Sequence, residues 1–149
     1  MINQRGTAVW NGDIKGSGEI TTQSGTVKAP YSTGARFEGE KGTNPEELIG
    51  AAHAGCFTMF LTSILTKDGK QVKQIQTESK VTLDTSGEVP KVVKITLSTE
   101  GEVAGLTPEE FQQYAEKAKE QCPMSQLLKA VPTMELASAK LRAASEPGN

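Results

Sequence analysis

The fold is decided by residues 44–65, which read NPEELIGAAHAGCFTMFLTSIL. Asn44 is a suitable helix N-cap, Pro45 suits the first helical position, and Glu47 lies three residues after the cap. The rest of the run is apolar on nearly all sides, which predicts a helix that is buried all round. Gly69 stands where a glycine C-cap would end this helix.

Besides the core of its own chain, a membrane or a second copy of the chain could cover the apolar surface of this helix. A membrane span needs about 20 apolar residues, whereas this run contains His53, three hydroxyl residues and two glycines. We therefore expect no membrane span. Since large apolar side chains are sparse elsewhere, we hypothesise that a second copy covers the helix. Small residues that permit close backbone approach are Gly50, Ala51, Ala52, Ala54 and Gly55.

The elements on either side of the helix predict an α+β fold with antiparallel sheet packed on helices. Before it, the Asn11-Gly12 turn joins strands predicted at 7–10 and 14–22, and residues 32–43 form a polar, glycine-containing stretch without a predicted element. After it, two strands, a helix, a short helix and a last strand are expected over residues 75–83, 93–97, 107–118, 122–129 and 131–141. The alternation of the last strand changes phase near Ala137.

The length and the net charge of the chain limit the number of domains and the classes of partner that can be expected. With 149 residues, the chain has the size of one domain, and we expect this domain at 1–142 and a flexible tail at 143–149. The 16 Lys and Arg against 18 Asp and Glu give a net charge of −2, which disfavours nucleic-acid binding. Residues 1–5 contain no apolar signal segment, so we expect a cytoplasmic protein.

The inventory of metal-ligating residues is small. The chain has two cysteines and one histidine, so a Cys₄, Cys₃His or Cys₂His₂ zinc site is either impossible or would use every one of these ligands. We expect no metal and no other cofactor. In a reducing cytosol two cysteines are more often reactive, or simply buried, than permanently bridged.

The two cysteines differ in local electrostatics. A free cysteine has a pKa of about 8.5, and burial would raise the pKa of Cys56 further, so Cys56 needs a nearby cation. Lowering that pKa by about two units takes about 2.7 kcal/mol, and one charge at about 4 Å offers about 4 kcal/mol at an effective dielectric constant of about 20. Cys122, as an N-cap before Pro123, faces free N–H groups and is the more acidic thiol by this local reasoning. The alternative for either cysteine is a small buried packing residue.

Four other residues have a purely structural interpretation, and one of them, His53, also has a chemical one. His53 lies three residues before Cys56 on the same helical face, either as a base or cation for that thiol or as a hydrogen-bonded core residue. Glu46 and Glu47 follow a proline, and the same Pro-Glu-Glu pattern opens the next helix, so helix initiation is the default role for both. Arg36, taken by itself, is a solvated surface residue.

Two longer stretches carry a family resemblance. Residues 36–57, which read RFEGEKGTNPEELIGAAHAGCF, resemble the family of osmotically inducible protein C (OsmC) and the organic hydroperoxide resistance proteins. Residues 117–130, which read KAKEQCPMSQLLKA, resemble the second cysteine motif of that family. The resemblance covers nearly the whole chain and is nearer to the osmotically inducible branch, with Gly55 standing where alanine is common.

The resemblance implies a homodimeric thiol peroxidase that reduces organic hydroperoxides and, more weakly, hydrogen peroxide. Cys56 would be the peroxidatic nucleophile and Cys122 the resolving thiol, so the resemblance reverses the local ranking of the two. Arg36 would lie against the Cys56 sulfur, with Glu46 holding Arg36 in place. The cycle would run through a Cys56 sulfenic acid and a Cys56–Cys122 disulfide, which an external dithiol, of the lipoyl type or another thiol, reduces.

The implied fold is an intertwined homodimer in which antiparallel sheets wrap around long central helices, with active sites at the subunit interface. Phe57, Phe60 and His53 are candidates for substrate binding, because an apolar lining would favour alkyl hydroperoxides. Two other functions fit the residues: a disulfide-exchange or redox-sensing protein, and a non-enzymatic module for apolar ligands in which both cysteines only pack.

Overall fold

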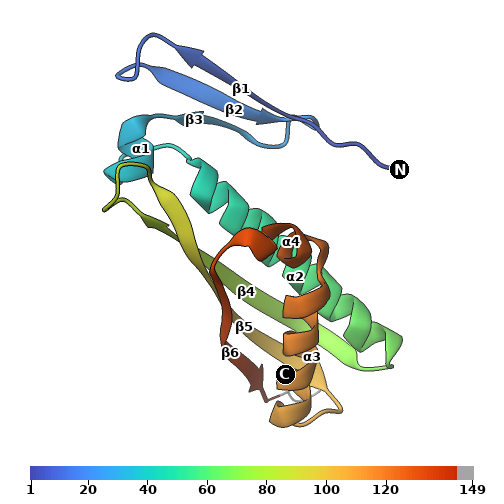
Figure 1. Ribbon diagram of the computed structural model, residues 1–149. Helices are drawn as coiled ribbons and strands as arrows, with labels where there is room; N and C mark the ends of the chain where they lie inside the picture. The colour runs from blue at the N-terminus through green and yellow to red at the C-terminus, as the bar shows by residue number, and fades with distance from the viewer. Residues whose placement is uncertain (144–149) are drawn as a thin grey trace. The chain divides into compact units, whose positions relative to one another are not determined.

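The computed structural model describes residues 1–143 and divides the chain into two units, Met1–Leu48 and Ile49–Asn149. Each unit contains its own three-stranded sheet, ordered β1-β2-β3 in the first and β4-β5-β6 in the second (Figure 1). The mixture of helices and separate sheets confirms the α+β class. The predicted tail lies outside the described residues except for Ala143, and the single domain over 1–142 stays a prediction.

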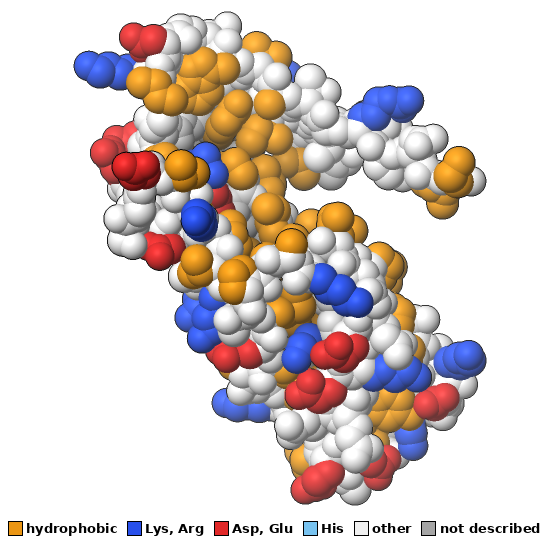
Figure 2. Space-filling view, in the orientation of Figure 1, with side chains coloured by type: hydrophobic (Ala, Val, Ile, Leu, Met, Phe, Trp, Pro, Cys, Tyr) orange, Lys and Arg blue, Asp and Glu red, His pale blue; other side chains and the backbone are white. Residues whose placement is uncertain are grey.

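The N-terminal unit is an antiparallel sheet followed by one short helix. Its strands are β1 (Gly6–Asn11), β2 (Ser17–Thr22) and β3 (Lys28–Tyr31), and the helix is α1 (Thr33–Phe37). The predicted hairpin is confirmed, with Gly12 at a φ of 91° that favours glycine. Figure 2 shows hydrophobic side chains at the surface of this unit, among which Val9, Ile14 and Phe37 are exposed.

Two short elements of this unit, β3 and α1, have no predicted counterpart in the sequence. β3 has four residues and α1 has five, too few for a periodic pattern to develop. The local signal for α1 is its N-cap, because the Ala35 N–H donates to Ser32 Oγ at 3.0 Å.

The long helix α2 (Pro45–Lys67) begins and ends where its caps predict. The Glu47 N–H donates to Asn44 Oδ1 at 2.8 Å, which satisfies one of the free donors of the first turn. At the other end, Gly69 has a φ of 75°, and the Lys70 N–H donates to the Leu65 carbonyl oxygen at 3.0 Å. Both caps are therefore confirmed.

The burial of α2 differs from the prediction. One stripe of the helix is buried, at Gly50, His53, Phe57, Leu61 and Leu65. The opposite stripe is exposed within this chain, and Met59 retains 76% of its accessible surface. All-round burial is thus wrong for the single chain, because its own sheet covers only one side. By length and composition alone α2 could also cross a membrane, but 28% of its most apolar window is buried inside the protein.

The sheet of the C-terminal unit comprises β4 (Gln71–Asp84), β5 (Lys91–Ala104) and β6 (Thr133–Arg142). Strands β4 and β5 are antiparallel as predicted, whereas β6 runs parallel to β5, so the expectation of wholly antiparallel sheet is wrong there. The reason is the helical crossover between them, which returns the chain in the same direction. The phase change near Ala137 is a bulge, because pairing moves from Leu97–Leu136 to Ser98–Ser138.

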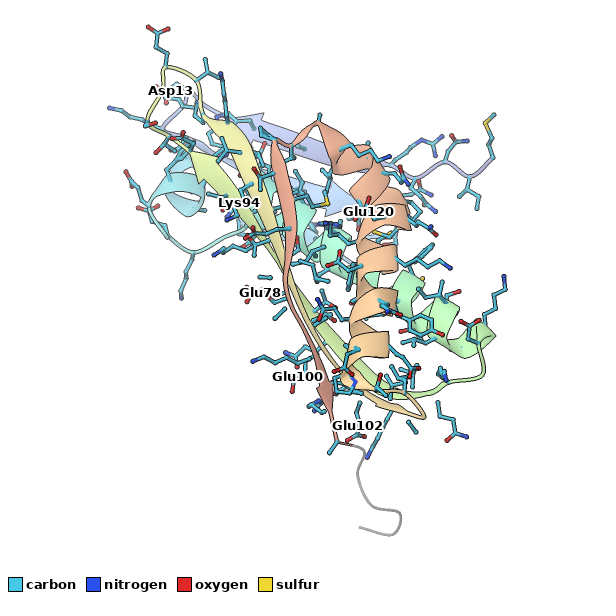
Figure 3. All side chains as sticks on the ribbon, turned by 60° about the horizontal axis from the view of Figure 1, so that its bottom comes forward. Asp13, Glu78, Lys94, Glu100, Glu102 and Glu120 are labelled. Atoms are coloured by element: carbon cyan, nitrogen blue, oxygen red, sulfur yellow. The ribbon has the colours of Figure 1, made fainter. Side chains whose placement is uncertain are left out.

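Two further helices complete the C-terminal unit: α3 (Pro108–Gln121) and α4 (Pro123–Leu127), the latter continued by the 3₁₀ turn Leu128–Ala130. The side chains of β5 alternate, and Figure 3 shows Glu100 pointing away from the helices. The buried core between helices and sheet contains Phe57, Leu61, Leu65, Leu97, Val103, Phe111, Ala115, Ala118 and Cys122.

Close packing of α2 on β4 depends on Gly50. A Cβ atom at Gly50 would lie 2.8 Å from the backbone oxygen of Ser79, which is too near for any larger residue without a shift. The small residue at this position thus serves the packing of the helix on its own sheet, and the approach of a second copy stays a prediction. This packing holds the first part of the helix against the middle of β4, which brings His53 within reach of the sheet.

Candidate active site

Arg36 and Glu46 form an ion pair within the N-terminal unit. The Arg36 Nε donates to Glu46 Oε1 and Oε2, both at 3.1 Å, and Nη2 donates to Oε1 as well. The hydrogen bond to Glu46 raises the pKa of Arg36, so the guanidinium stays charged. The arginine also lies 5.3 Å from the ring centre of Phe37. Glu46 thus holds the Nε and Nη2 edge of the Arg36 guanidinium, and the Nη1 group is not part of these hydrogen bonds.

Glu47 makes different contacts from its neighbour. Its carboxylate accepts a hydrogen bond from Thr43 Oγ1 at 2.7 Å, and its N–H is the one capped by Asn44. Both contacts belong to the start of α2. The two adjacent glutamates therefore have separate roles, one in the ion pair and one in helix initiation.

Cys56 and Cys122 lie together in the C-terminal unit, and both are free thiols. Cys56 is half-buried in the middle of α2, and Cys122 is fully buried as the N-cap of α4. The predicted cap is confirmed, because the Ser125 N–H donates to Cys122 Sγ at 3.4 Å. Cys56 packs against the buried core that contains Cys122, and the Cys122 side chain is among the causes that raise the pKa of the Cys56 thiol, so the two cysteines lie near each other although 66 residues separate them in sequence.

The surroundings of Cys56 within its own unit do not activate it. Burial raises the pKa of the Cys56 thiol, and the Cys122 sulfur raises it further. A hydrogen bond from the Met124 backbone N–H acts in the opposite direction and lowers the pKa, without cancelling the effect of burial. The predicted direction of the shift is confirmed, whereas the need for a nearby cation stays a prediction.

His53 is fully buried and bonded on both ring nitrogens. Its Nδ1 lies 3.1 Å from Ser79 Oγ on β4, and its Nε2 lies 2.8 Å from Ser125 Oγ on α4. Burial lowers the pKa of His53, so the neutral imidazole predominates at neutral pH. The imidazole is thus linked to the Cys122 thiol through Ser125.

Phe57 and Phe60 occupy different environments. Phe57 is fully buried in the core, and Phe60 is partly buried against it. Their part in substrate binding stays a prediction, as does that of His53.

Three residues of the site were not named from the sequence: Ser79, Met124 and Ser125. Only Ser125 carries a local signal, because it follows the N-cap Cys122 by three residues and its N–H is the one such a cap binds.

The arrangement is suited to thiol oxidation. Two neighbouring thiols can be joined by a disulfide when one of them is oxidised, provided that their sulfur atoms can meet. Within residues 1–143 no group of three or more His, Cys, Asp or Glu side chains could hold a metal ion.

Known proteins share this sequence and fold. The family model described as OsmC-like protein matches residues 38–137. The chain is 46% identical over 136 residues to Peroxiredoxin OsmC of Escherichia coli, covering 90% of this chain and 95% of the relative. It is 33% identical over 115 residues to Organic hydroperoxide resistance protein-like 1 of Staphylococcus saprophyticus, covering 73% of this chain and 77% of the relative.

A solved structure agrees. The Organic Hydroperoxide Resistance Protein OhrB of Bacillus subtilis matches with a TM-score of 0.65 at 25% identity, over 93% of this chain and 97% of that chain. The resemblance inferred from the two cysteine motifs is confirmed, and this chain belongs to the OsmC family.

Proposed function

We propose that this protein is a thiol-dependent peroxidase that reduces organic hydroperoxides to alcohols, and hydrogen peroxide more weakly. The observation that carries the proposal is that Cys56 packs against the buried core that contains Cys122, with both cysteines present as free thiols. Two relatives bear the names of a peroxiredoxin and an organic hydroperoxide resistance protein, which supports the same chemistry. A reducing compartment such as the cytoplasm keeps both thiols free at the start of each cycle.

The proposed cycle uses Cys56 as nucleophile. Its thiolate attacks the terminal oxygen of ROOH, the O–O bond breaks, and RO⁻ leaves and takes up a proton as ROH. The sulfenic acid on Cys56 then condenses with the Cys122 thiol to form a disulfide and water. An external dithiol returns both cysteines to thiols by exchange. The cycle as written needs no cofactor.

Arg36 is the cation that we propose for Cys56. It stays charged through Glu46, and Cys56 lacks activation from its own unit. A guanidinium beside the sulfur would lower the thiol pKa and stabilise the negative charge that develops on the leaving oxygen.

The alkyl part of the substrate has a matching surface beside Arg36. A cavity of about 440 Å³ in the N-terminal unit is lined by this arginine and by apolar side chains, among them Trp10, Ile14, Tyr31 and Phe37. An apolar cavity next to a cation supports a substrate with a hydrocarbon body and a polar peroxide end.

The ion pair gives a prediction with a built-in control. Glu46→Gln removes the charge that holds Arg36, and we expect the rate of Cys56 oxidation to fall about 10-fold, the effect of one charge-assisted hydrogen bond. Glu47→Gln should leave that rate unchanged and lower the melting temperature by about 2–4 °C, because it weakens the start of α2. Stopped-flow oxidation and thermal unfolding measure the two effects. Equal losses of rate in both variants would contradict the division of roles.

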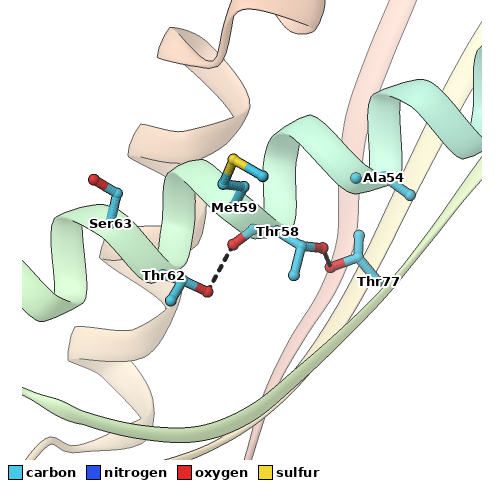
Figure 4. A pocket seen from close by; sticks show the side chains of 7 residues that line it. Ala54, Thr58, Met59, Thr62, Ser63 and Thr77 are labelled. Atoms are coloured by element: carbon cyan, nitrogen blue, oxygen red, sulfur yellow. Dashed lines mark hydrogen bonds between the residues drawn. The ribbon is translucent and has the colours of Figure 1, made fainter. Parts of the chain in front are cut away.

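A second copy of the chain is the occupant that we propose for the exposed stripe of α2. Figure 4 shows this face, where an open groove of about 680 Å³ runs along the helix beside Met59, Thr58 and Thr62. Small residues along the groove, including Ala54 and Gly55, permit close approach of another backbone.

The dimer gives a separate prediction. Met59→Asp places a charge in the groove, and we expect sedimentation equilibrium to show a shift from dimer to monomer. The control is Val89→Asp, because Val89 is also exposed, at 66%, and lies outside the groove. A dimer that survives Met59→Asp unchanged would place the interface elsewhere.

Peroxidase turnover is tested by following consumption of cumene hydroperoxide with a dithiol such as dihydrolipoamide. We expect catalytic turnover that is faster with cumene hydroperoxide than with hydrogen peroxide. Disulfide exchange with the dithiol, without consumption of hydroperoxide, would instead support a redox-exchange protein. If the protein carried out neither reaction, that result would support a module for apolar ligands.

A further inference from the structure

A line of hydrogen bonds joins the Cys122 thiol to the buried imidazole. Cys56 packs against the core that contains Cys122, and the Cys122 Sγ donates to Ser125 Oγ at 3.2 Å. Ser125 Oγ lies 2.8 Å from His53 Nε2, and His53 Nδ1 lies 3.1 Å from Ser79 Oγ. His53 and Cys122 have no exposed surface and Ser125 has 2%, so water does not replace these bonds.

The donors and acceptors along this line can be assigned consistently. With the ring proton on Nδ1, His53 donates to Ser79 and its Nε2 accepts from the Ser125 hydroxyl. Ser125 then accepts from the Cys122 thiol, as its geometry indicates. Ser125 gives one proton to the imidazole and receives one from the thiol, which is the arrangement that a proton transfer requires.

We propose that His53, acting through Ser125, takes up the proton of Cys122 when the disulfide forms, so that it is a positioning residue of the resolving step. This inference rests on the peroxidase function proposed above. It assigns His53 to the resolving thiol, whereas the sequence suggested a partner for Cys56.

The atoms and electrons of the step balance as follows. The Cys122 sulfur attacks the sulfur of the Cys56 sulfenic acid, the S–S bond forms, and the S–O bond breaks with its electrons leaving on oxygen. The Cys122 proton passes to Ser125 while the Ser125 proton passes to His53 Nε2. The hydroxide takes up a proton to become water, and the imidazolium releases one to solvent, so no net proton is gained or lost.

Neutral His53 is required for this transfer. The titratable neighbours of the His53 imidazole are Cys122, the N-cap of α4, and Cys56, one turn further along α2. On the side of β4, the imidazole meets the hydroxyl of Ser79. The charged residues beside Ser79, Glu78 and Lys80, are exposed, and Figure 3 shows Glu78 pointing away from the helices. Because burial lowers the pKa of His53, the acceptor is available at neutral pH and is lost when the pH falls through that lowered pKa.

The test separates oxidation from resolution in single turnover. Wild type, Ser125→Ala and His53→Gln are each mixed with one equivalent of cumene hydroperoxide, quenched at intervals, and analysed by mass spectrometry. In Ser125→Ala we expect Cys56 sulfenic acid to form at the wild-type rate within about two-fold. In both variants we expect the conversion of sulfenic acid to disulfide to slow by about 100-fold, the lower end for a lost acid–base group. Excess hydroperoxide should then convert Cys56 to sulfinic acid.

The control for a lost buried hydroxyl is Thr99→Val. Thr99 Oγ1 bonds to Thr77 Oγ1 at 3.0 Å and to the Gln76 carbonyl oxygen at 3.2 Å, outside the line to the Cys122 thiol. We expect Thr99→Val to lower stability but to form the disulfide at the wild-type rate. The double variant Ser125→Ala/His53→Gln should be no slower than either single variant, because both interrupt one path.

The pH profile gives a readout that a packing role would not move. In wild type the rate of disulfide formation should fall toward low pH as His53 becomes protonated, and this limb should be absent in His53→Gln. The inference is overturned if Ser125→Ala and His53→Gln form the disulfide as fast as Thr99→Val. If wild-type Cys56 resists oxidation by the hydroperoxide, this inference fails together with the peroxidase proposal. If Cys56 is oxidised normally but the two variants form the disulfide at the wild-type rate, this inference alone fails.

Discussion

Cys56→Ser is expected to reduce hydroperoxide consumption to the rate seen without protein, because no other sulfur can take the oxygen at this position. Cys122→Ser is expected to act differently: supplied with one equivalent of hydroperoxide per chain and no reductant, it should consume that equivalent and remain as Cys56 sulfenic acid. The two variants therefore separate the nucleophile from the resolving thiol. Consumption of cumene hydroperoxide and trapping of the sulfenic acid by dimedone measure these outcomes.

The pair also checks the local ranking of the thiols. The N-cap position of Cys122 is real, and a cap bond reaches its sulfur at 3.4 Å. If this thiol were the nucleophile, Cys122→Ser would abolish the first turnover and Cys56→Ser would preserve it. That reversal would refute the assignment taken from the family.

Arg36→Met is expected to slow Cys56 oxidation about 100-fold at pH 7, the effect of raising a thiol pKa by about two units. Burial already raises the pKa of the Cys56 thiol, and without the guanidinium little would offset it. Methionine preserves much of the apolar length of arginine, so packing beside Phe37 and Pro45 changes little.

The pH dependence separates the two roles proposed for Arg36. The reactive form is the thiolate, so the rate rises with pH, and in Arg36→Met the rise should be displaced to higher pH. If the arginine only lowered the pKa, the two proteins would react equally fast once both thiols were ionised. We expect a residual deficit there, because the guanidinium also stabilises the leaving oxygen. An unchanged profile would show that another group ionises Cys56.

Local signals predicted the starts of α2, α3 and α4 well, whereas α1 was not predicted. Asn44, Thr107 and Cys122 are all N-caps in the structure, since a cap depends on residues within one turn of it. The bulge at Ala137 was visible as a change of alternation, which is also a local property. By contrast, the parallel pairing of β6 depends on the path of the intervening helices, and no pattern inside β6 records it.

The side of α2 that its own chain covers could not be predicted. Apolar residues surround the helix, so periodicity does not distinguish the core stripe at Phe57 and Leu61 from the exposed stripe at Met59. The contacts of His53 were equally hidden, because Ser79 and Ser125 lie 26 and 72 residues away in sequence. Only the tertiary fold brings such positions together. The pairing of Arg36 with Glu46, by contrast, was predicted from the resemblance to the family motif.

The most direct test of the central claim is the state of the two sulfurs after one equivalent of cumene hydroperoxide. Intact mass spectrometry followed by peptide mapping under non-reducing conditions would identify the product. The account predicts the loss of two hydrogen atoms per chain and a single peptide pair joined through Cys56 and Cys122 within the same chain. Unmodified thiols, or a disulfide that joins two chains, would contradict it.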